Sequence, residues 1–296
     1  MRGTKAASPQ VKRLDIVPVI LAGGMGMRLR PLTHPLRPKP FLKLFSKNSL
    51  FQETLERCLP FAPPVVVGAS SFAPQFFEQS YEVGVKLDTI IGEPAQRGTA
   101  IAIACAALHL KDHEGWMCVM PSDHAVEKPD ALFAAIEKAA RLPHEFVLIG
   151  APPRAMSSRY GHIVCDGAGD VVRFAEKPAR SRIPALAKEG RVVWNTGIFL
   201  CQPAVFLGRL KKLQPELYSL AEHAMDVEAV HEGFVFPDAD AYMAARSVSV
   251  DVSVMEHVSN AAVVPIDGAW GDVGTLGAFF HEIITRVTHF ILNRFL

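Results

Sequence analysis

A glycine-rich loop followed by two cations is the pattern in this sequence that is best suited to chemistry. Gly23, Gly24 and Gly26 follow an apolar run, and Arg28 stands shortly after them. Glycines let backbone N–H groups approach phosphate oxygens because no Cβ stands in the way, and an arginine adds a fixed positive charge. Lys39, held between two prolines that restrict its backbone, supplies a second cation. Together these residues predict a site that cradles a triphosphate.

Other interpretations of these residues can be compared position by position. The dinucleotide fingerprint G-x-G-x-x-G, started at Gly24, would need glycine at Leu29, and G-x-x-x-x-G-K-[ST] is absent from the sequence. A zinc-protease motif that begins at His281 would need a second histidine where Thr285 stands. Taken alone, the loop is also compatible with a tight strand-to-helix turn that carries an exposed arginine.

Two aspartates follow apolar, strand-like runs in distant parts of the chain. Asp123 ends one such run, and Asp272 lies in a loop after Trp270. If the fold brings them together, their oxygens form the hard ligand pair that Mg²⁺ prefers. Each aspartate also has a structural interpretation, because Asp is a preferred N-cap. Asp123 would then cap a helix near Pro129, and Asp272 would cap the last helix.

The first half of the chain predicts the scaffold that positions these residues. From Ile16 onward, short β-rich runs alternate with helical stretches, as expected for βαβ units on a mostly parallel sheet. Continuous apolar runs at 17–22 and 117–120 fit strands that helices cover on both faces. Because ligands collect at the carboxyl ends of such strands, we expect the site at the loops around Gly23 and Pro121.

The second half predicts a lobe inserted into the same α/β domain. Residues 161–178 contain two alternating runs around a Gly-containing turn at 166–170, which is typical of a β-hairpin. A helical stretch, a strand-like run at 192–202, two helical stretches rich in Leu and Ala, and a strand at 261–266 follow. We expect this lobe to cover a bound substrate.

Composition excludes several classes of protein. With 296 residues, 49% of them hydrophobic, the chain can bury a large core. A net charge of +1 argues against nucleic acid held by a basic field, and no uninterrupted apolar stretch reaches the length of a membrane span. Five scattered cysteines without C-x-x-C spacing are expected to be core thiols. We expect a soluble, cytoplasmic protein without nucleic-acid or membrane partners.

Three segments are expected along the chain. Residues 1–15 form a flexible extension without the apolar segment of a secretory signal, 16–275 form the main domain, and 276–296 form a C-terminal helix. One face of that helix is apolar, from Leu276 to Ile291. We favour packing of this face on its own domain, and a homodimer through the helix is the alternative.

Several motifs in the same order resemble the sugar-phosphate nucleotidyltransferases, and within them the mannose-1-phosphate guanylyltransferases. The resemblance implies a Rossmann-like (GT-A-like) sheet and the transfer of a guanylyl group from GTP to mannose 1-phosphate, which yields GDP-mannose and pyrophosphate. Because the attacking phosphate oxygen is already an anion, such a reaction needs positioning and charge neutralisation rather than a general base. The matching segments are residues 21–33, 37–42, 92–95, 98–108, 120–124, 174–178, 194–199, 249–251 and 270–274.

The resemblance also implies roles for individual residues. Arg28, Lys39, Asp123 and Asp272 are implied to be catalytic, with Mg²⁺ as the cofactor on the two aspartates. The residues implied to bind the nucleotide are Ala22, Gly23, Gly24, Gly26, Glu93 and Ser122. Those implied to bind the sugar phosphate are Gly161, Glu176, Lys177 and Asn195. We add the hypothesis that Glu93 selects the base, because a carboxylate can accept hydrogen bonds from the ring N–H and amino group of guanine, a pair that adenine lacks.

The sequence departs from the family pattern at several positions. Gly98 stands where the family usually has Asn, and Ile101 where it has Pro. Met27, Arg30 and Pro40 also differ from the usual residues. Two alternatives therefore stay open: transfer of another nucleotide or to another hexose 1-phosphate, and a non-catalytic paralogue that binds a sugar nucleotide and regulates a partner.

Overall fold

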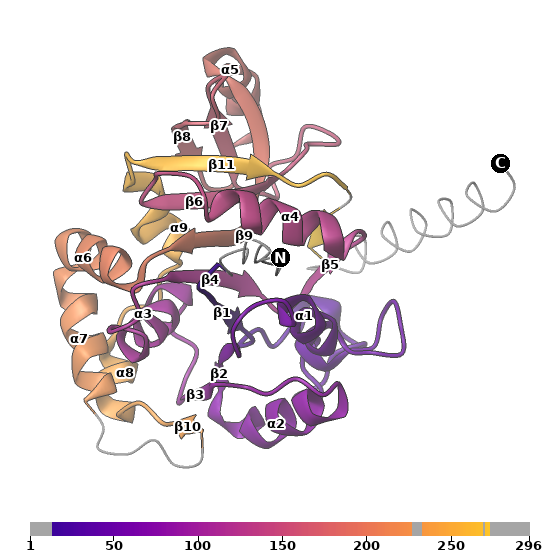
Figure 1. Ribbon diagram of the computed structural model, residues 1–296, viewed down its shortest axis with the longest axis vertical. Coiled ribbons are helices and arrows are strands. Elements are labelled where there is room, and N and C mark those ends of the chain that lie inside the picture. The colour runs from indigo at the N-terminus through magenta and orange to yellow at the C-terminus, as the bar shows by residue number, and fades with distance from the viewer. Residues whose placement is uncertain (1–13, 227–232, 269, 273–296) are drawn as a thin grey trace, which may run out of the picture.

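The computed structural model describes residues 14–226, 233–268 and 270–272. A mostly parallel sheet forms its centre, helices cover both faces, and a smaller β-rich lobe stands at one end (Figure 1). This arrangement confirms the predicted α/β architecture. The C-terminal helix predicted over 276–296, its proposed dimer contact, and nearly all of the extension predicted over 1–15 lie outside the described residues.

The central sheet has the strand order β10-β3-β2-β1-β4-β9-β6-β11. Neighbouring strands are parallel except where β9 runs against β4 and β6. The apolar strand β1 is buried along nearly its whole length, as expected for a strand between two helical layers. The strands of this sheet are β1 (Ile16–Leu21), β2 (Val65–Ala69), β3 (Thr89–Glu93), β4 (Trp116–Pro121), β6 (Phe146–Ala151), β9 (Arg191–Cys201), β10 (Phe234–Val235) and β11 (Ala261–Pro265).

Two hydrophobic cores lie on opposite faces of the sheet. Ile16 and Ile20 of β1 belong to the core under α1, α2 and α4, whereas Val17 and Val19 belong to the core under α3, α6, α7 and α8. All five cysteines are free and buried, which confirms the predicted core thiols. No helix among the described residues has both the length and the apolar character that a membrane crossing requires. The helices beside these two cores include α1 (Leu50–Cys58), η3 (Ser70–Phe72), α2 (Ala73–Glu82), α3 (Thr99–His109), α4 (Pro129–Ala139), α6 (Pro203–Leu213), α7 (Pro215–Met225) and α8 (Ala239–Ala244).

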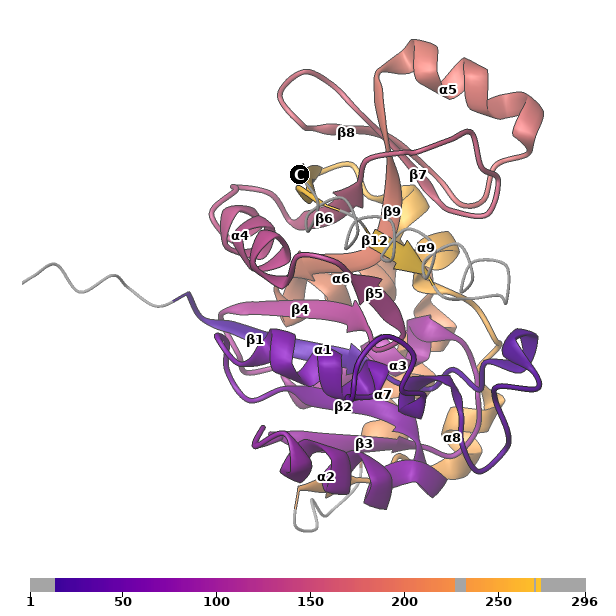
Figure 2. The same cartoon turned by 90° about the vertical axis from the view of Figure 1, so that its right-hand side faces the viewer.

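The lobe is built on the hairpin of β7 (His162–Cys165) and β8 (Val171–Ala175), followed by η4 (Arg180–Arg182) and α5 (Ile183–Glu189) (Figure 2). Asp166 closes the hairpin turn, because its Oδ1 accepts three backbone N–H groups at 2.9 Å. The predicted hairpin is therefore confirmed. Strand β9 begins in the lobe beside β7 and ends in the central sheet between β4 and β6, so one continuous strand joins the two parts.

Candidate active site

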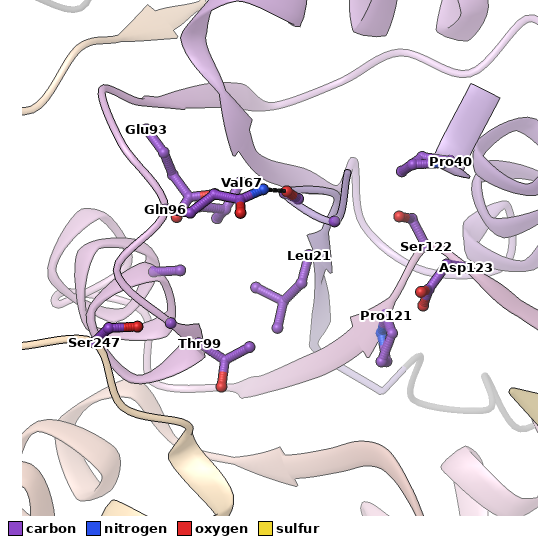
Figure 3. Close-up of a pocket in the computed structure, with 14 residues that line it drawn as sticks. Leu21, Pro40, Val67, Glu93, Gln96, Thr99, Pro121, Ser122, Asp123 and Ser247 are labelled. Carbon is purple, nitrogen blue, oxygen red and sulfur yellow. Dashed lines mark hydrogen bonds between the residues drawn. The ribbon is translucent and has the colours of Figure 1, made fainter. Parts of the chain in front are cut away.

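A cavity of about 450 Å³ opens at the carboxyl ends of β1, β3 and β4. This volume is in the range of small-molecule sites, and the position agrees with the expectation for a parallel sheet. Figure 3 shows Glu93 and Ser247 at one end of the cavity and Ser122 and Asp123 at the other. The lining residues are Leu21, Gly23, Gly24, Pro40, Val67, Glu93, Gln96, Gly98, Thr99, Ala102, Pro121, Ser122, Asp123 and Ser247.

The glycine loop forms part of the cavity wall. Gly23 and Gly24 line the cavity, and a Cβ on Gly23 would lie only 2.6 Å from Glu93 Oε2. Gly26 has a φ of +65°, and a Cβ on it would lie 2.6 Å from Lys39 Cβ. Glycine is therefore required at Gly26 by both its backbone conformation and the contact with Lys39, whereas a side chain at Gly23 would displace the end of the Glu93 side chain.

Three of the residues implied to act in this loop do not line the cavity: Ala22, Gly26 and Arg28. Ala22 is buried and donates its backbone N–H to Val67 O over 2.7 Å. Arg28 lies exposed in the short helix η1 (Met27–Leu29) and forms no ion pair within the described ranges. Its contact with a phosphate therefore stays a prediction.

Lys39 lies where the predicted metal ligands converge. Its Nζ is 2.6 Å from Asp123 Oδ2 and 3.2 Å from Asp272 Oδ1. Lys39 itself is only 3% exposed. It starts the short helix η2 (Lys39–Phe41), which Phe41 anchors by packing against the rings of Phe51 and Phe76. The buried ammonium is thus held by an aromatic cluster on one side and paired with two carboxylates on the other.

A small two-stranded sheet brings the two aspartates together. Strand β5 (His124–Val126) pairs antiparallel with β12 (Trp270–Asp272), and Asp272 stands opposite His124, the residue next to Asp123. Helix α1 supports this loop through Thr54, whose hydroxyl donates to Ser122 O at 3.4 Å. The alternative that Asp123 caps the following helix is wrong, because the N-cap of α4 is Lys128 without a side-chain cap.

The electrostatics of this cluster suit a divalent cation. Burial by itself would raise the pKa of Asp123, but the positive charge and hydrogen bond of Lys39, together with His124, lower it below its ordinary value. Two carboxylates around one ammonium leave a net negative charge at the end of the cavity. The described residues contain no cluster of three or more metal-ligating side chains. Two carboxylates nevertheless fit Mg²⁺, which usually takes its other ligands from water and substrate phosphates.

Ser122 and Glu93 supply polar groups at opposite ends of the cavity. Ser122 Oγ is buried and has no hydrogen-bond partner within the part of the chain that the structure describes, which is unusual for a buried hydroxyl beside a cavity. Glu93 is 7% exposed, and burial raises the pKa of its carboxyl group, an effect that a hydrogen bond from Tyr242 opposes. Sequence reasoning missed Tyr242, because nothing in its surroundings in the sequence distinguishes it from an ordinary core tyrosine.

The residues implied to bind the sugar phosphate gather in the lobe. Asn195 donates its backbone N–H to Gly161 O over 2.8 Å. A Cβ on Gly161 would lie 2.7 Å from Glu176 Oε2 and 3.1 Å from Asn195 Cβ. Lys177 has the unusual φ of +42°, and its ammonium forms an ion pair with Glu176. All four predicted residues therefore belong to one group of side chains.

Asp251 is a fifth member of this group, and sequence reasoning assigned it no role. It lies in α9 (Val250–Ser253) and accepts a hydrogen bond of 2.8 Å from Asn195 Nδ2. Burial and the negative charge of Glu176 raise the pKa of Asp251 to about 6. The segment 249–251 had already been noted as a motif, but an aspartate in the first turn of a helix is so common that its position indicated no site.

Packing between the lobe and the loop at residues 121–123 places the lobe residues next to the two aspartates. A Cβ on Gly197, in the irregular part of β9, would lie 3.2 Å from Pro121 Cγ. The ring of Tyr160 stands 4.7 Å from that of Trp194 in the lobe and 5.4 Å from that of Trp270 beside Asp272. The arrangement thus combines a cavity in the size range of small-molecule sites, a pair of carboxylates at its end, and a group of carboxylate, amide and ammonium side chains in the lobe.

Comparison with known proteins agrees with this geometry. Residues 17–287 match the family described as nucleotidyl transferase. The chain is 37% identical over 270 residues to the xanthan biosynthesis protein XanB of Xanthomonas campestris pv. campestris, a match that covers 88% of this chain and 58% of that protein. It is 35% identical over 276 residues to the mannose-1-phosphate guanylyltransferase of Sinorhizobium fredii, covering 89% of this chain and 54% of that protein.

A solved structure described as a mannose-6-phosphate isomerase from Helicobacter pylori has the same fold. It gives a TM-score of 0.77 at 27% identity, with 88% of this chain and 100% of that chain covered. The curated relatives are considerably longer, since the chain spans only 58% and 54% of the two compared above.

Proposed function

The chain belongs to the nucleotidyl transferase family, and we propose that it transfers a guanylyl group from GTP to mannose 1-phosphate, yielding GDP-mannose and pyrophosphate. The observation that supports this proposal best is the cluster of Lys39, Asp123 and Asp272. Asp123 lines the cavity, and Tyr160 packs between Trp270, next to this cluster, and Trp194 in the lobe that carries the predicted sugar-phosphate residues. We assign this activity to residues 16–275 as one domain.

The proposed reaction is a displacement at the α-phosphorus of GTP. An oxygen of the mannose 1-phosphate attacks, the bond between the α-phosphorus and the bridging oxygen to the β-phosphorus breaks, and pyrophosphate leaves with that electron pair. The attacking oxygen is already ionised, so the protein has to align the two substrates and neutralise their charge. Lys39 is the buried cation beside Asp123 and Asp272, and we assign it to the reacting phosphates. Arg28 on the glycine loop is the second cation that we assign to the triphosphate.

Asp123 and Asp272 are the residues that would hold Mg²⁺. When bound, the metal supplies positive charge that stabilises the phosphate oxygens and the leaving pyrophosphate. Lys39 already shows that both carboxylates accept one cation between them. Ser122 lies beside Asp123, and its hydroxyl is buried without a partner among the described residues, so we assign to it a hydrogen bond to a phosphate oxygen.

The base and the sugar are assigned to opposite ends of the arrangement. Glu93 lies at the end of the cavity away from Asp123, and we assign to its carboxylate the role of accepting the two N–H donors of guanine. In the lobe, Glu176, Asn195 and Asp251 offer carboxylate and amide groups for sugar hydroxyls, and Lys177 offers an ammonium for the sugar phosphate.

Two of the three compared proteins are named for a mannose phosphate, but their names describe different reactions, a guanylyl transfer and an isomerisation. Two-substrate transfer accounts for both the cavity under the glycine loop and the separate group in the lobe, whereas isomerisation of a hexose phosphate would leave the cavity without a ligand. The name of the Sinorhizobium relative, mannose-1-phosphate guanylyltransferase, describes a two-substrate transfer. The geometry therefore favours transfer over isomerisation for this chain.

The proposal is tested by pyrophosphate release in the presence of Mg²⁺. GTP, ATP, UTP, CTP and dTTP are each combined with mannose 1-phosphate, glucose 1-phosphate and other hexose 1-phosphates. Release confined to GTP with mannose 1-phosphate is the expected result. Another productive pair would retain the chemistry and move the specificity, while no release from protein that still binds a nucleotide sugar would favour the regulatory alternative.

A further inference from the structure

A buried hydrogen bond ties the base end of the cavity to a distant part of the chain. Tyr242, on α8, donates its hydroxyl to Glu93 Oε1 over 2.6 Å, across 149 residues of sequence. Tyr242 is 0% exposed and is among the largest fully buried side chains of the described residues. The hydroxyl therefore has no access to water and has the glutamate as its partner.

The two oxygens of Glu93 consequently have different surroundings. Oε1 is engaged by Tyr242, whereas Oε2 lies over Gly23, where a Cβ would approach it to 2.6 Å. Gly23 and Glu93 both line the cavity, so Oε2 is the oxygen on the side of the glycine loop. The tyrosine thus fixes how the carboxylate is turned, while Oε1 keeps a second lone pair and Oε2 keeps both, so each oxygen can still accept an N–H donor of a base.

The hydroxyl also acts on the charge of Glu93. Burial favours the protonated acid and raises the pKa of Glu93, while the hydrogen bond from Tyr242 favours the carboxylate. Burial and the neighbouring charge of Glu93 in turn raise the pKa of Tyr242, so this residue keeps its proton and acts as a donor. Cys105 is a further titratable group that interacts with Glu93. Burial raises the pKa of the Cys105 thiol, so the thiol stays neutral.

Gly98 itself offers no side chain to the base end of the cavity. The family usually has an Asn here, but Gly98 has a φ of +82° and a Cβ on it would lie 2.3 Å from Val248 O. The same backbone segment places Ser247 in the cavity wall. No side chain longer than hydrogen fits at position 98 without displacing that segment, so the base end of the cavity has no amide at this position, and Glu93 is the acidic side chain that lines this end.

We propose that Tyr242 is a positioning residue for base selection: it holds the Glu93 carboxylate as an acceptor turned toward the glycine loop, so that the cavity prefers a base edge with two adjacent N–H donors. This inference rests on the proposed function in that guanine is the base with such an edge. A protonated or rotated Glu93 would no longer demand two donors, and the preference for GTP over ATP would fall.

The test compares Tyr242→Phe with Tyr218→Phe. Tyr218 donates to Glu222 Oε1 over the same 2.6 Å, but this pair is exposed on α7 and serves as the matched control. Dissociation constants of GTP and ATP are measured by titration calorimetry between pH 6 and 8.5. Tyr242→Phe should reduce the preference for GTP by about tenfold or more, as expected for a lost hydrogen bond to a charged group, with the larger loss at lower pH. Tyr218→Phe should match the wild type.

A second background separates positioning from simple packing. In Glu93→Gln, adding Tyr242→Phe should cause no further change in base preference, because the tyrosine acts through the carboxylate. Tyr242→Phe alone leaves the buried Glu93 carboxylate without its hydrogen bond, and this variant could fail to fold for that reason. Glu93→Gln and the double variant carry no charge at position 93, so the comparison between these two can still be made in that case. A further loss in the double variant would overturn the proposal, as would a Tyr242→Phe protein with the wild-type preference and pH profile.

The same experiment distinguishes failure of this inference from failure of the proposed function. Wild-type protein that binds GTP in preference to ATP, loses this preference in Tyr242→Phe, yet releases no pyrophosphate with mannose 1-phosphate would refute the function and keep the inference. If the wild type transfers the guanylyl group and Tyr242→Phe keeps the wild-type base preference, the proposed function is kept and the role of Tyr242 is refuted. A wild type without any preference for GTP would overturn the role of Tyr242.

Discussion

Replacing Lys39 with methionine should destabilise the protein when Mg²⁺ is absent and should increase the stabilisation that Mg²⁺ provides. The Lys39 ammonium lies 2.6 Å from Asp123 and 3.2 Å from Asp272. Methionine retains most of the apolar stem but removes the charge, so the two carboxylates would be left near each other without a counter-ion. A bound Mg²⁺ would then replace the missing charge without having to compete with the lysine.

The size of the effect follows from burial. Removing one partner of a fully buried ion pair costs roughly 3–5 kcal/mol. The Asp123 and Asp272 side chains are 28% and 37% exposed, so water screens part of the interaction and we expect a loss of about 2 kcal/mol. In a protein of this size, such a loss lowers the melting temperature by about 4–8 °C.

Thermal unfolding in EDTA and in Mg²⁺ measures this prediction. The matched control is Lys43→Met, which removes the same charge from an exposed position of the same segment. We expect Lys39→Met alone to melt lower in EDTA and to gain more than the wild type on addition of Mg²⁺. If Lys39→Met melted at the wild-type temperature in EDTA and gained no more from Mg²⁺ than the wild type, Lys39 would not be the counter-ion of these carboxylates.

Three further variants test the remaining parts of the site. Asp123→Asn should abolish pyrophosphate release while the circular dichroism spectrum stays native, and near-normal turnover would remove the proposed metal role. Gly161→Ala should raise the KM for the hexose 1-phosphate and leave GTP affinity unchanged, because a Cβ there would lie 2.7 Å from Glu176 Oε2; Gly167→Ala, which has open space around it, should alter neither constant. Asp251 has a folded-state pKa of about 6, above its ordinary value of 3.8, so the folded protein binds this proton more tightly and the resulting stability is present at low pH and lost as the pH rises through 6. Asp251→Asn removes that titration, and denaturant titrations from about pH 4 to 7 should show its stability rising relative to the wild type; a constant difference would contradict the assignment.

The sequence predicted those features that depend on local patterns. The apolar run at β1 and the Gly-containing hairpin at 162–175 were recognised because a few consecutive residues carry the signal, through continuous burial in one case and alternation in the other. The meeting of Asp123 and Asp272 had no such signal. It depends on β5 and β12, two strands of three residues that lie far apart in the chain, and so short a strand has no detectable periodicity.

The two site residues that sequence reasoning missed, Tyr242 and Asp251, come from one segment, residues 239–253. Tyr242 from this segment donates to Glu93 at the base end of the cavity, and Asp251 accepts from Asn195 in the sugar group. Between them, Val248 hydrogen-bonds with the backbone at the start of α3, where its carbonyl accepts from Ala100 N over 3.2 Å. A single segment therefore contacts residues assigned to both substrates. A change that shifts the backbone of this segment should weaken base preference and sugar affinity together. Substitution of Tyr242 alone should change only the base preference, and substitution of Asp251 alone should change only the sugar affinity.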